Sequence, residues 1–138
     1  MLIRIDTHGG VPIFRQVKEQ ITRMILSGQL TPGEKLESVA NLSKQLKVNP
    51  MTVSKAYSFM VEEALVERRA GIGVFVAEIP KNKQREMTGS LLAATLNKAA
   101  TLSIQLGLKK GEAQEMLGEA FTKIQSQQEG GNAKRKGQ

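Results

Sequence analysis

The sequence predicts an α+β fold in which a small domain of helices and one hairpin is followed by two further helices. Apolar residues recur at helical spacing in three segments before residue 62. Two short apolar runs then flank a glycine-bearing tip at residues 70–73, and two longer apolar stripes follow residue 86. A chain of 138 residues can bury one core plus a modest extension, but not comfortably a second, ligand-enclosing domain.

The first predicted helix covers residues 12–27. Proline at position 12 suits the first turn of a helix, and Gly28 can take the left-handed conformation that ends one. The apolar face of this helix is Phe14, Val17, Ile21, Met24 and Ile25. Thr31-Pro32-Gly33 indicates a turn, and residues 34–37 are expected to form a loop.

Ser38 is predicted to cap a second, short helix, because its hydroxyl can accept a hydrogen bond from a backbone N–H of the first turn. The apolar face of this helix is Val39, Leu42 and Leu46. Lys47 and Val48 are expected to form a tight turn. Asn49 can then cap a third helix, and Pro50 can take its first position, where a missing N–H costs nothing.

The third helix separates an inward from an outward set of side chains. The inward stripe is predicted to be Val53, Ala56, Met60 and Val61, which leaves Met51, Thr52, Ser54 and Lys55 outside on the first turns. When the second helix of a helix-turn-helix lies in the major groove, residues at these positions reach base edges and phosphates. An ordinary pair of core helices is the alternative that the pattern leaves open.

The two apolar runs predict a β-hairpin formed by residues 65–69 and 74–77. Neighbouring side chains on a strand point to opposite faces, so at most one of Arg68 and Arg69 is expected to face a DNA backbone. Gly71 and Gly73 lie between two strands and not before a helix, so they do not match a nucleotide-binding loop. The complete order of elements predicts a winged helix-turn-helix.

The C-terminal part predicts a helical hairpin. Its first apolar stripe is Met87, Leu91, Leu92, Leu96, Ala99, Leu102 and Leu106, ended by Gly107, and its second is Ala113, Met116, Leu117, Ala120, Phe121 and Ile124. Two helices joined by a short turn cannot hide both stripes alone. We expect a homodimer through Leu91, Leu92, Leu96, Ala99, Leu102, Leu106, Met116, Leu117 and Phe121; completion of a monomer core is the alternative.

These signals divide the chain into a winged helix-turn-helix domain at residues 1–78, a linker at 79–85, the helical hairpin at 86–128 and a basic tail at 129–138. Pro80 and mixed charge indicate the linker. The tail is polar and glycine-rich, contains Lys134-Arg135-Lys136, and is expected to be disordered. It either adds non-specific attraction to DNA or serves only solubility.

The formal net charge of +7 and the sequence pI near 9.9 favour polyanionic partners such as nucleic acid. Lys and Arg outnumber Asp and Glu by only 10 to 8 in residues 1–80, against 10 to 5 in residues 81–138, so the predicted DNA-binding part is mildly basic. The first residues, with Arg4, Asp6 and His8, match neither a signal peptide nor a membrane span. We expect a soluble cytoplasmic protein.

An enzyme is not expected. The chain has one histidine, His8, and no cysteine, which excludes disulfides, thiolate chemistry and a typical zinc site. No pair of acidic residues has a spacing that indicates an acid–base dyad. The methionines lie mostly on predicted core stripes. The sequence therefore indicates no metal and no cofactor, and it does not identify a small-molecule effector.

Several motifs occur together in residues 11–77. They are Pro12-Ile13-Phe14-Arg15-Gln16-Val17, the run from Ile25 through Thr31-Pro32-Gly33 to Leu36, Val48-Asn49-Pro50 with Thr52-Val53, Ala56-Tyr57, and Leu65-Val66-Glu67-Arg68-Arg69 with Gly73-Val74-Phe75-Val76. With these motifs the segment resembles the N-terminal domain of the GntR superfamily of bacterial transcription regulators. The Asn-Pro-x-Thr-Val run and the short C-terminal extension are similar to the YtrA-type branch, which dimerises through two C-terminal helices.

The resemblance implies a dimeric repressor, of a kind often encoded beside the membrane transporter genes that it represses. It places the helix from Pro50 in the major groove and the wing at residues 69–73 on the backbone or in the minor groove. The DNA-binding residues expected are Ser38, Lys44, Asn49, Pro50, Met51, Thr52, Ser54, Lys55, Arg68, Arg69, Gly71 and Ile72.

One loop departs from the family pattern. Where the family has Leu-Pro-Ser-x-Arg, this chain has Leu36-Glu37-Ser38-Val39-Ala40, so Glu37 replaces proline and Ala40 replaces an arginine that typically contacts DNA. Loss of that cation and gain of a carboxylate predict weak binding. Phosphate contacts are still expected from Lys44, Lys47, Lys55, Arg68 and Arg69, which predict strong salt dependence and modest sequence discrimination. A winged-helix protein-interaction module with weak or partner-dependent DNA binding is the alternative.

Overall fold

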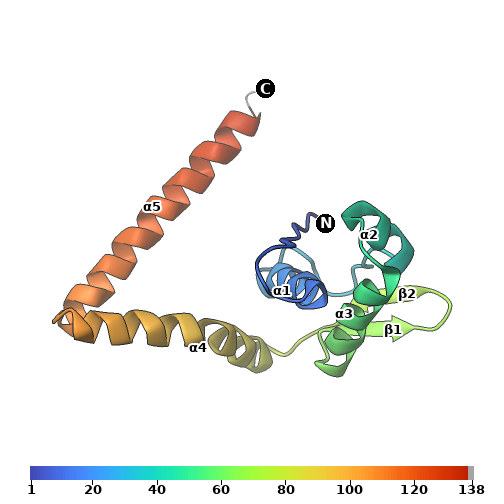
Figure 1. Cartoon of the computed structure of the whole chain (residues 1–138), viewed down its shortest axis with the longest axis horizontal. Helices are drawn as coiled ribbons and strands as arrows, with labels where there is room; N and C mark the ends of the chain where they lie inside the picture. The colour runs from blue at the N-terminus through green and yellow to red at the C-terminus, as the bar shows by residue number, and fades with distance from the viewer. Residues whose placement is uncertain (137–138) are drawn as a thin grey trace. The chain divides into compact units, whose positions relative to one another are not determined.

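The computed structural model describes residues 1–136, with side chains up to residue 131. The elements in this range are α1 (Ile13–Leu26), α2 (Val39–Leu46), α3 (Pro50–Glu62), β1 (Val66–Arg69), β2 (Gly73–Val76), α4 (Lys81–Gln105) and α5 (Lys110–Lys136) (Figure 1). The chain divides into two compact units, Met1–Thr88 and Gly89–Gln138, with the boundary inside α4. The first unit is a winged helix-turn-helix, as the sequence predicts.

The core of the first unit lies where α1 and α2 pack against α3. Val17 and Ile21 of α1 and Val53 and Ala56 of α3 are fully buried, in agreement with the predicted apolar stripes. Burial of a side chain such as valine or isoleucine stabilises the fold by about 1.5–3 kcal/mol relative to its exposure. These contacts fix the orientation of α3 against α1.

The predicted helix ends are confirmed by their capping groups. Ser38 Oγ accepts a hydrogen bond from the backbone N–H of Asn41 at 3.1 Å, and Asn49 Oδ1 accepts one from that of Met51 at 2.9 Å. Lys47, at the C-terminal end of α2, has the left-handed φ of 56° that reverses the chain before α3. Local sequence signals therefore set the helix-turn-helix geometry.

The wing is an antiparallel pair in which Val66 faces Val76 and Arg69 faces Gly73. Its bounds differ from the predicted hairpin by one residue at the start of each strand and at the end of the second. The segment at residues 33–36, which the sequence predicts only as a loop, pairs with β2. The N–H of Leu36 donates to Val74 O at 2.9 Å, and the N–H of Val76 donates to Glu34 O at 2.8 Å. Strand β2 is therefore hydrogen-bonded along both edges.

The N-terminal segment is anchored to α1. The Gln16 amide bonds with the backbone N–H and C=O of Asp6 at 2.8 and 2.7 Å, and the Gln20 amide bonds with those of Arg4 at 2.9 and 2.6 Å. Ile3 is buried in the core. The N-terminus therefore packs along α1 up to Asp6.

In the C-terminal part, the two described helices extend over segments that the sequence predicts as a linker and a tail. Helix α4 begins at Lys81, so most of the linker predicted at residues 79–85 is helical. Pro80 precedes this helix, where its missing N–H costs nothing, and Gln84 Nε2 donates back to Ile79 O at 2.9 Å.

Helix α5 continues to Lys136, beyond residue 128, so the tail predicted as disordered is helical as far as it is described. Gly130 and Gly131 weaken a helix by about 1 kcal/mol each but keep the N–H that the helix needs. The rest of the predicted tail, residues 137–138, lies outside the described residues.

The helical hairpin leaves its apolar side chains at the surface. Gly107, with φ of 79°, ends α4 as predicted. The large exposed apolar residues of α4, α5 and the turn between them are Leu91, Leu92, Leu96, Leu102, Ile104, Leu106, Met116, Leu117, Phe121 and Ile124. Even so, none of the helices in the described range is both long and apolar enough to span a bilayer.

Candidate nucleic-acid interface

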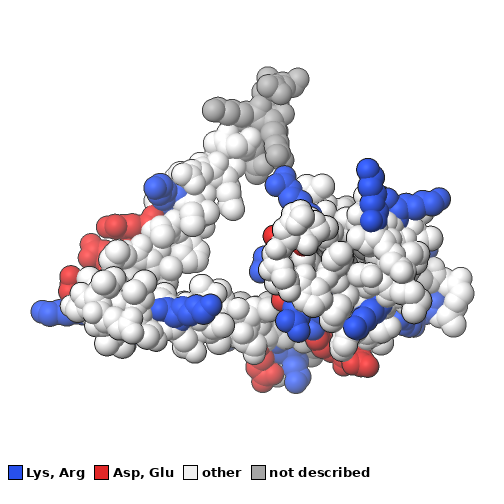
Figure 2. All heavy atoms as spheres, in the orientation of Figure 1, with Lys and Arg blue, Asp and Glu red and all other residues white. Residues whose placement is uncertain are grey.

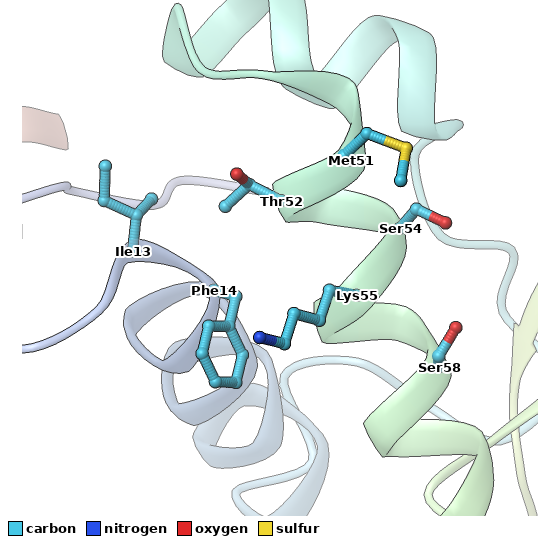
Figure 3. A pocket seen from close by; sticks show the side chains of 7 residues that line it. All are labelled: Ile13, Phe14, Met51, Thr52, Ser54, Lys55 and Ser58. Atoms are coloured by element: carbon cyan, nitrogen blue, oxygen red, sulfur yellow. The ribbon is translucent and has the colours of Figure 1, made fainter.

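The first two turns of α3 present the four side chains that the sequence predicts to face outward. Met51 is 74% exposed, Lys55 is exposed, and Thr52 and Ser54 are half-buried. All four border one hollow of about 630 Å³ between α1 and α3, completed by Ile13, Phe14 and Ser58 (Figure 3). One apolar, two hydroxyl and one cationic side chain therefore share a single surface at the N-terminal end of α3.

Two aromatic rings and two lysines join α1 to α3 beside this hollow. The Lys55 Nζ lies 4.2 Å from the centroid of the Phe14 ring, and Figure 3 shows the ammonium directed toward that ring. Phe14 stacks on Phe59 with centroids 5.5 Å apart, and Lys18 Nζ lies 5.8 Å from the Phe59 centroid. Lys18 also forms an ion pair with Glu63. The sequence shows Phe14 only as an apolar helix position.

The wing arginines have different neighbours, as the alternation of a strand requires. Arg68 Nη2 donates a hydrogen bond to Ser58 Oγ of α3 at 2.9 Å. The guanidinium of Arg69 lies 4.1 Å from the centroid of the Phe75 ring. Both cations are exposed, and each is held by a specific neighbour.

A second hollow, of about 400 Å³, separates the wing from the start of α2. It brings together Ser38, Arg68, Arg69, Gly71 and Ile72 with Lys35, Leu36, Glu37, Val39, Tyr57, Ala70, Gly73 and Val74. Ile72 at the wing tip is 61% exposed. Lys44, Asn49 and Pro50 line neither hollow, although all three are exposed. Most of the predicted DNA-binding residues thus border two adjacent surfaces of one unit.

The second hollow includes Glu37, the residue that replaces the proline of the family pattern. Tyr57, buried under this loop, donates its hydroxyl to the backbone oxygen of Glu37 at 2.7 Å. Burial, and secondarily the Glu37 carboxylate, raises the pKa of Tyr57 well above its usual value. The phenol therefore remains a neutral donor that fixes the loop carrying Glu37 and Ser38.

Basic side chains are spread over the visible face of the winged unit and do not form one dense patch (Figure 2). This agrees with the mildly basic charge of residues 1–80. Within the described residues, no group of three His, Cys, Asp or Glu side chains is arranged to hold a metal ion. The surface offers hydrogen bonds, a few cations and two exposed apolar side chains, which suit the edges of base pairs and the phosphates beside them.

The winged unit matches a known family of regulators. The family model described as "Bacterial regulatory proteins, gntR family" matches residues 14–76, from α1 to the end of β2. The regulator Rv1152 of Mycobacterium tuberculosis is 31% identical over 115 residues, which cover 83% of this chain and 90% of that protein. The chain belongs to the GntR family. This GntR-family protein is a DNA-binding transcription regulator and not an enzyme.

Two further similarities indicate the YtrA-type branch of the GntR family. The repressor YtrA of Bacillus subtilis is 38% identical over 80 residues, or 58% of this chain and 62% of that relative's length. The structure of YtrA from Sulfolobus acidocaldarius, a GntR-family transcription factor, is 32% identical, with a TM-score of 0.56 over 70% of this chain and 99% of that one. The branch inferred from the sequence is therefore confirmed.

Proposed function

We propose that this GntR-family regulator is a dimeric repressor that inserts α3 into the major groove. The observation that carries the proposal is the shared surface of Met51, Thr52, Ser54 and Lys55 on the first turns of α3. The N-terminal residues of such a helix read base edges, and its dipole favours nearby phosphate. Asn49 and Pro50, at the start of α3, lie at the same end.

The wing supplies the second contact. Arg68 and Arg69 are exposed and held in place, and Ile72 projects from the tip between Gly71 and Gly73. In this proposal Arg68, held beside the outward face of α3, binds phosphate, and the tip lies on the backbone or in the minor groove. Ser38 and Lys44 at α2 complete the contacts, so binding falls steeply with salt.

The exposed apolar stripes of α4 and α5 support dimerisation. Leu91, Leu96, Leu102, Leu117 and Phe121 are each about half exposed or more. Leu92, Ala99, Leu106 and Met116 belong to the same predicted interface, and a cleft of about 450 Å³ between α4 and α5 includes Leu96, Ala99 and Leu117. A second copy with the same surface would cover these residues symmetrically. Two α3 helices would then read half-sites about one DNA turn apart.

Repression is inferred from the similarity to Bacillus subtilis YtrA, whose name states that it is a repressor. A dimer on a promoter blocks polymerase by occupancy alone, and we place this activity in the cytoplasm, where bacterial DNA lies. The second candidate is a protein-interaction module of the same fold. It is favoured by Glu37, which puts a carboxylate in the hollow beside the wing, and by Ala40, where the family has an arginine.

Fluorescence anisotropy with the DNA upstream of the protein's own gene, and with a shuffled fragment of equal length, tests the proposal over a series of salt concentrations. We expect tighter binding to the native fragment and a loss of this preference in Thr52→Ala. Lys98→Gln, on α4 outside both hollows, is the matched surface control and retains the preference. Equal binding to both fragments, or none, would favour the interaction module.

A further inference from the structure

Helices α1 and α3 are joined on their outer side by a row of stacked side chains that we name the α1–α3 ladder. Its members in spatial order are Lys55, Phe14, Phe59, Lys18 and Glu63. Phe14 and Lys18 are four residues apart on α1. Lys55 and Phe59 have the same interval on α3, and Glu63, the residue that ends this helix, follows four residues later. Residues at this interval share one helix face, so each turn of α1 meets one turn of α3.

The two lysines at the ladder differ in their charge environment. Lys18 lies over Phe59 and is paired with the Glu63 carboxylate. Lys55 lies closer to its ring, at 4.2 Å from the Phe14 centroid, and the ion pairs found in the described residues are Lys18 with Glu63 and Lys83 with Glu86. The Phe14 ring therefore orients the Lys55 ammonium without neutralising it.

An oriented and unneutralised lysine is well suited to bind phosphate. A free lysine side chain loses much rotational freedom when it binds an anion, and a side chain already held in position loses less. The ammonium of Lys55 borders the same hollow as Thr52, Ser54 and Met51. A phosphate beside the groove that α3 occupies would meet it there.

We propose that Phe14 is a positioning residue for DNA binding, which holds the Lys55 ammonium ready for one DNA phosphate. The inference rests on the proposed insertion of α3 into the major groove. Phe14 itself contacts Lys55 and Phe59 and lies at the half-buried edge of the core. Its face binds a cation, which a leucine of similar hydrophobicity cannot do.

A double-mutant cycle separates positioning from packing. Wild type, Phe14→Leu, Lys55→Gln and the double variant are titrated with the native upstream fragment at several salt concentrations. Lys55→Gln should reduce the slope of log K against log salt by about 0.9, as expected for one phosphate contact. Phe14→Leu should weaken binding about two- to fivefold and leave the slope unchanged, because the cation remains.

In the Lys55→Gln background, Phe14→Leu should have no further effect on affinity. An equal weakening in both backgrounds would overturn the inference, because it would mean that Phe14 acts only through packing. Lys18→Gln is the matched control, since this lysine also lies over a ring but is already paired with Glu63. It should leave the salt slope unchanged, and a loss equal to that of Lys55→Gln would overturn the assignment of Lys55.

A measurement without DNA tests the same contact. In the free wild-type protein, the ring current of Phe14 should shift the Lys55 Hε proton resonances upfield, and Phe14→Leu should return them to ordinary values. Unshifted resonances in wild type would contradict the contact. If wild type binds no DNA, the proposed function fails; if it binds and the cycle is additive, only the role of Phe14 fails. Thermal unfolding of each variant verifies that it is folded.

Discussion

Arg68 of the wing donates a hydrogen bond from Nη2 to Ser58 Oγ of α3 at 2.9 Å. The two elements proposed to contact DNA are thus joined to each other directly, outside the hydrophobic core. Since both residues are exposed, the bond contributes little to folding. Its main effect is to fix where the wing cation lies relative to the outward face of α3.

Arg68→Ala should reduce DNA affinity and lower the salt slope by about 0.9, because one phosphate contact is lost. Ser58→Ala keeps the Arg68 guanidinium but removes the hydrogen bond that positions it. Affinity should therefore fall by less than in Arg68→Ala, and the salt slope should stay as in wild type. Anisotropy titrations at several salt concentrations measure both. Neither variant should change the free energy of unfolding by more than about 0.5 kcal/mol. Equal slopes in wild type and Arg68→Ala would contradict a phosphate contact.

Ala40→Arg should strengthen binding to the native fragment by about one order of magnitude, since a well-placed arginine can form bidentate contacts. Position 40 is exposed in the first turn of α2, so the longer side chain fits without repacking the core. Ala40→Gln, with similar length and no charge, is the control and should gain little. No gain from the arginine would mean that α2 does not approach DNA in the family's manner.

Met51 should read the 5-methyl group of a thymine, because it is a large apolar side chain that is 74% exposed on α3. Substitution of deoxyuridine for thymidine at that base should weaken wild-type binding about two- to fivefold, in line with the loss of one buried methyl group. Met51→Gln should be insensitive to this change, whereas Ser54→Ala should respond as wild type does. A position-by-position scan of the bound fragment provides the measurement.

Leu96→Lys should convert a dimer into a monomer, because the new charge lies in the cleft between α4 and α5 and within the proposed interface. DNA affinity should then fall by about two orders of magnitude, as two half-sites are no longer bound together. Asn97→Lys adds the same charge to the neighbouring, exposed polar position and should remain dimeric. Light scattering after size-exclusion chromatography distinguishes the two states, and a monomeric wild type would contradict the interface.

Tyr57→Phe should lower the free energy of unfolding by about 0.5–1.5 kcal/mol, because the hydrogen bond to the Glu37 backbone oxygen is lost. The raised pKa of Tyr57 also predicts a pH dependence. An unfolded chain ionises its tyrosine near pH 10 while the folded chain keeps it neutral, so stability is full below about pH 10 and falls above it. Tyr57→Phe, which has no ionisable hydroxyl at this position, should not show this part of the fall in stability at high pH.

Because Tyr57 is the only tyrosine in the chain, the absorbance of tyrosinate reports its ionisation directly. The folded protein should show little tyrosinate at a pH where the urea-unfolded protein is largely ionised. Coincident titration curves would contradict the buried, hydrogen-bonded phenol.

The helix-turn-helix could be predicted from sequence because its signals are local. Ser38, Asn49 and Pro50 act within one turn of the helices that they begin, and Lys47 reverses the chain between them. The features that sequence reasoning missed depend on distant partners. The amide of Gln16 bonds with Asp6, which no periodicity indicates.

The same limit applies to the candidate site. The outward position of Lys55 follows from helical spacing, whereas its contact with Phe14 requires knowledge of how α1 lies on α3. Pro80 and mixed charge predict a linker, because a proline marks an interruption but does not show whether a helix ends or begins there. In this chain it precedes α4.

The pairing of residues 33–36 with β2 changes which substitutions evolution can accept near the wing. The peptide N–H groups of Leu36 and Val76 are both committed to hydrogen bonds with the facing chain. Proline at either position would remove a donor that no side chain can replace. Selection on this stretch therefore acts on the backbone, and sequence variation among functional descendants should exclude proline at 36 and 76.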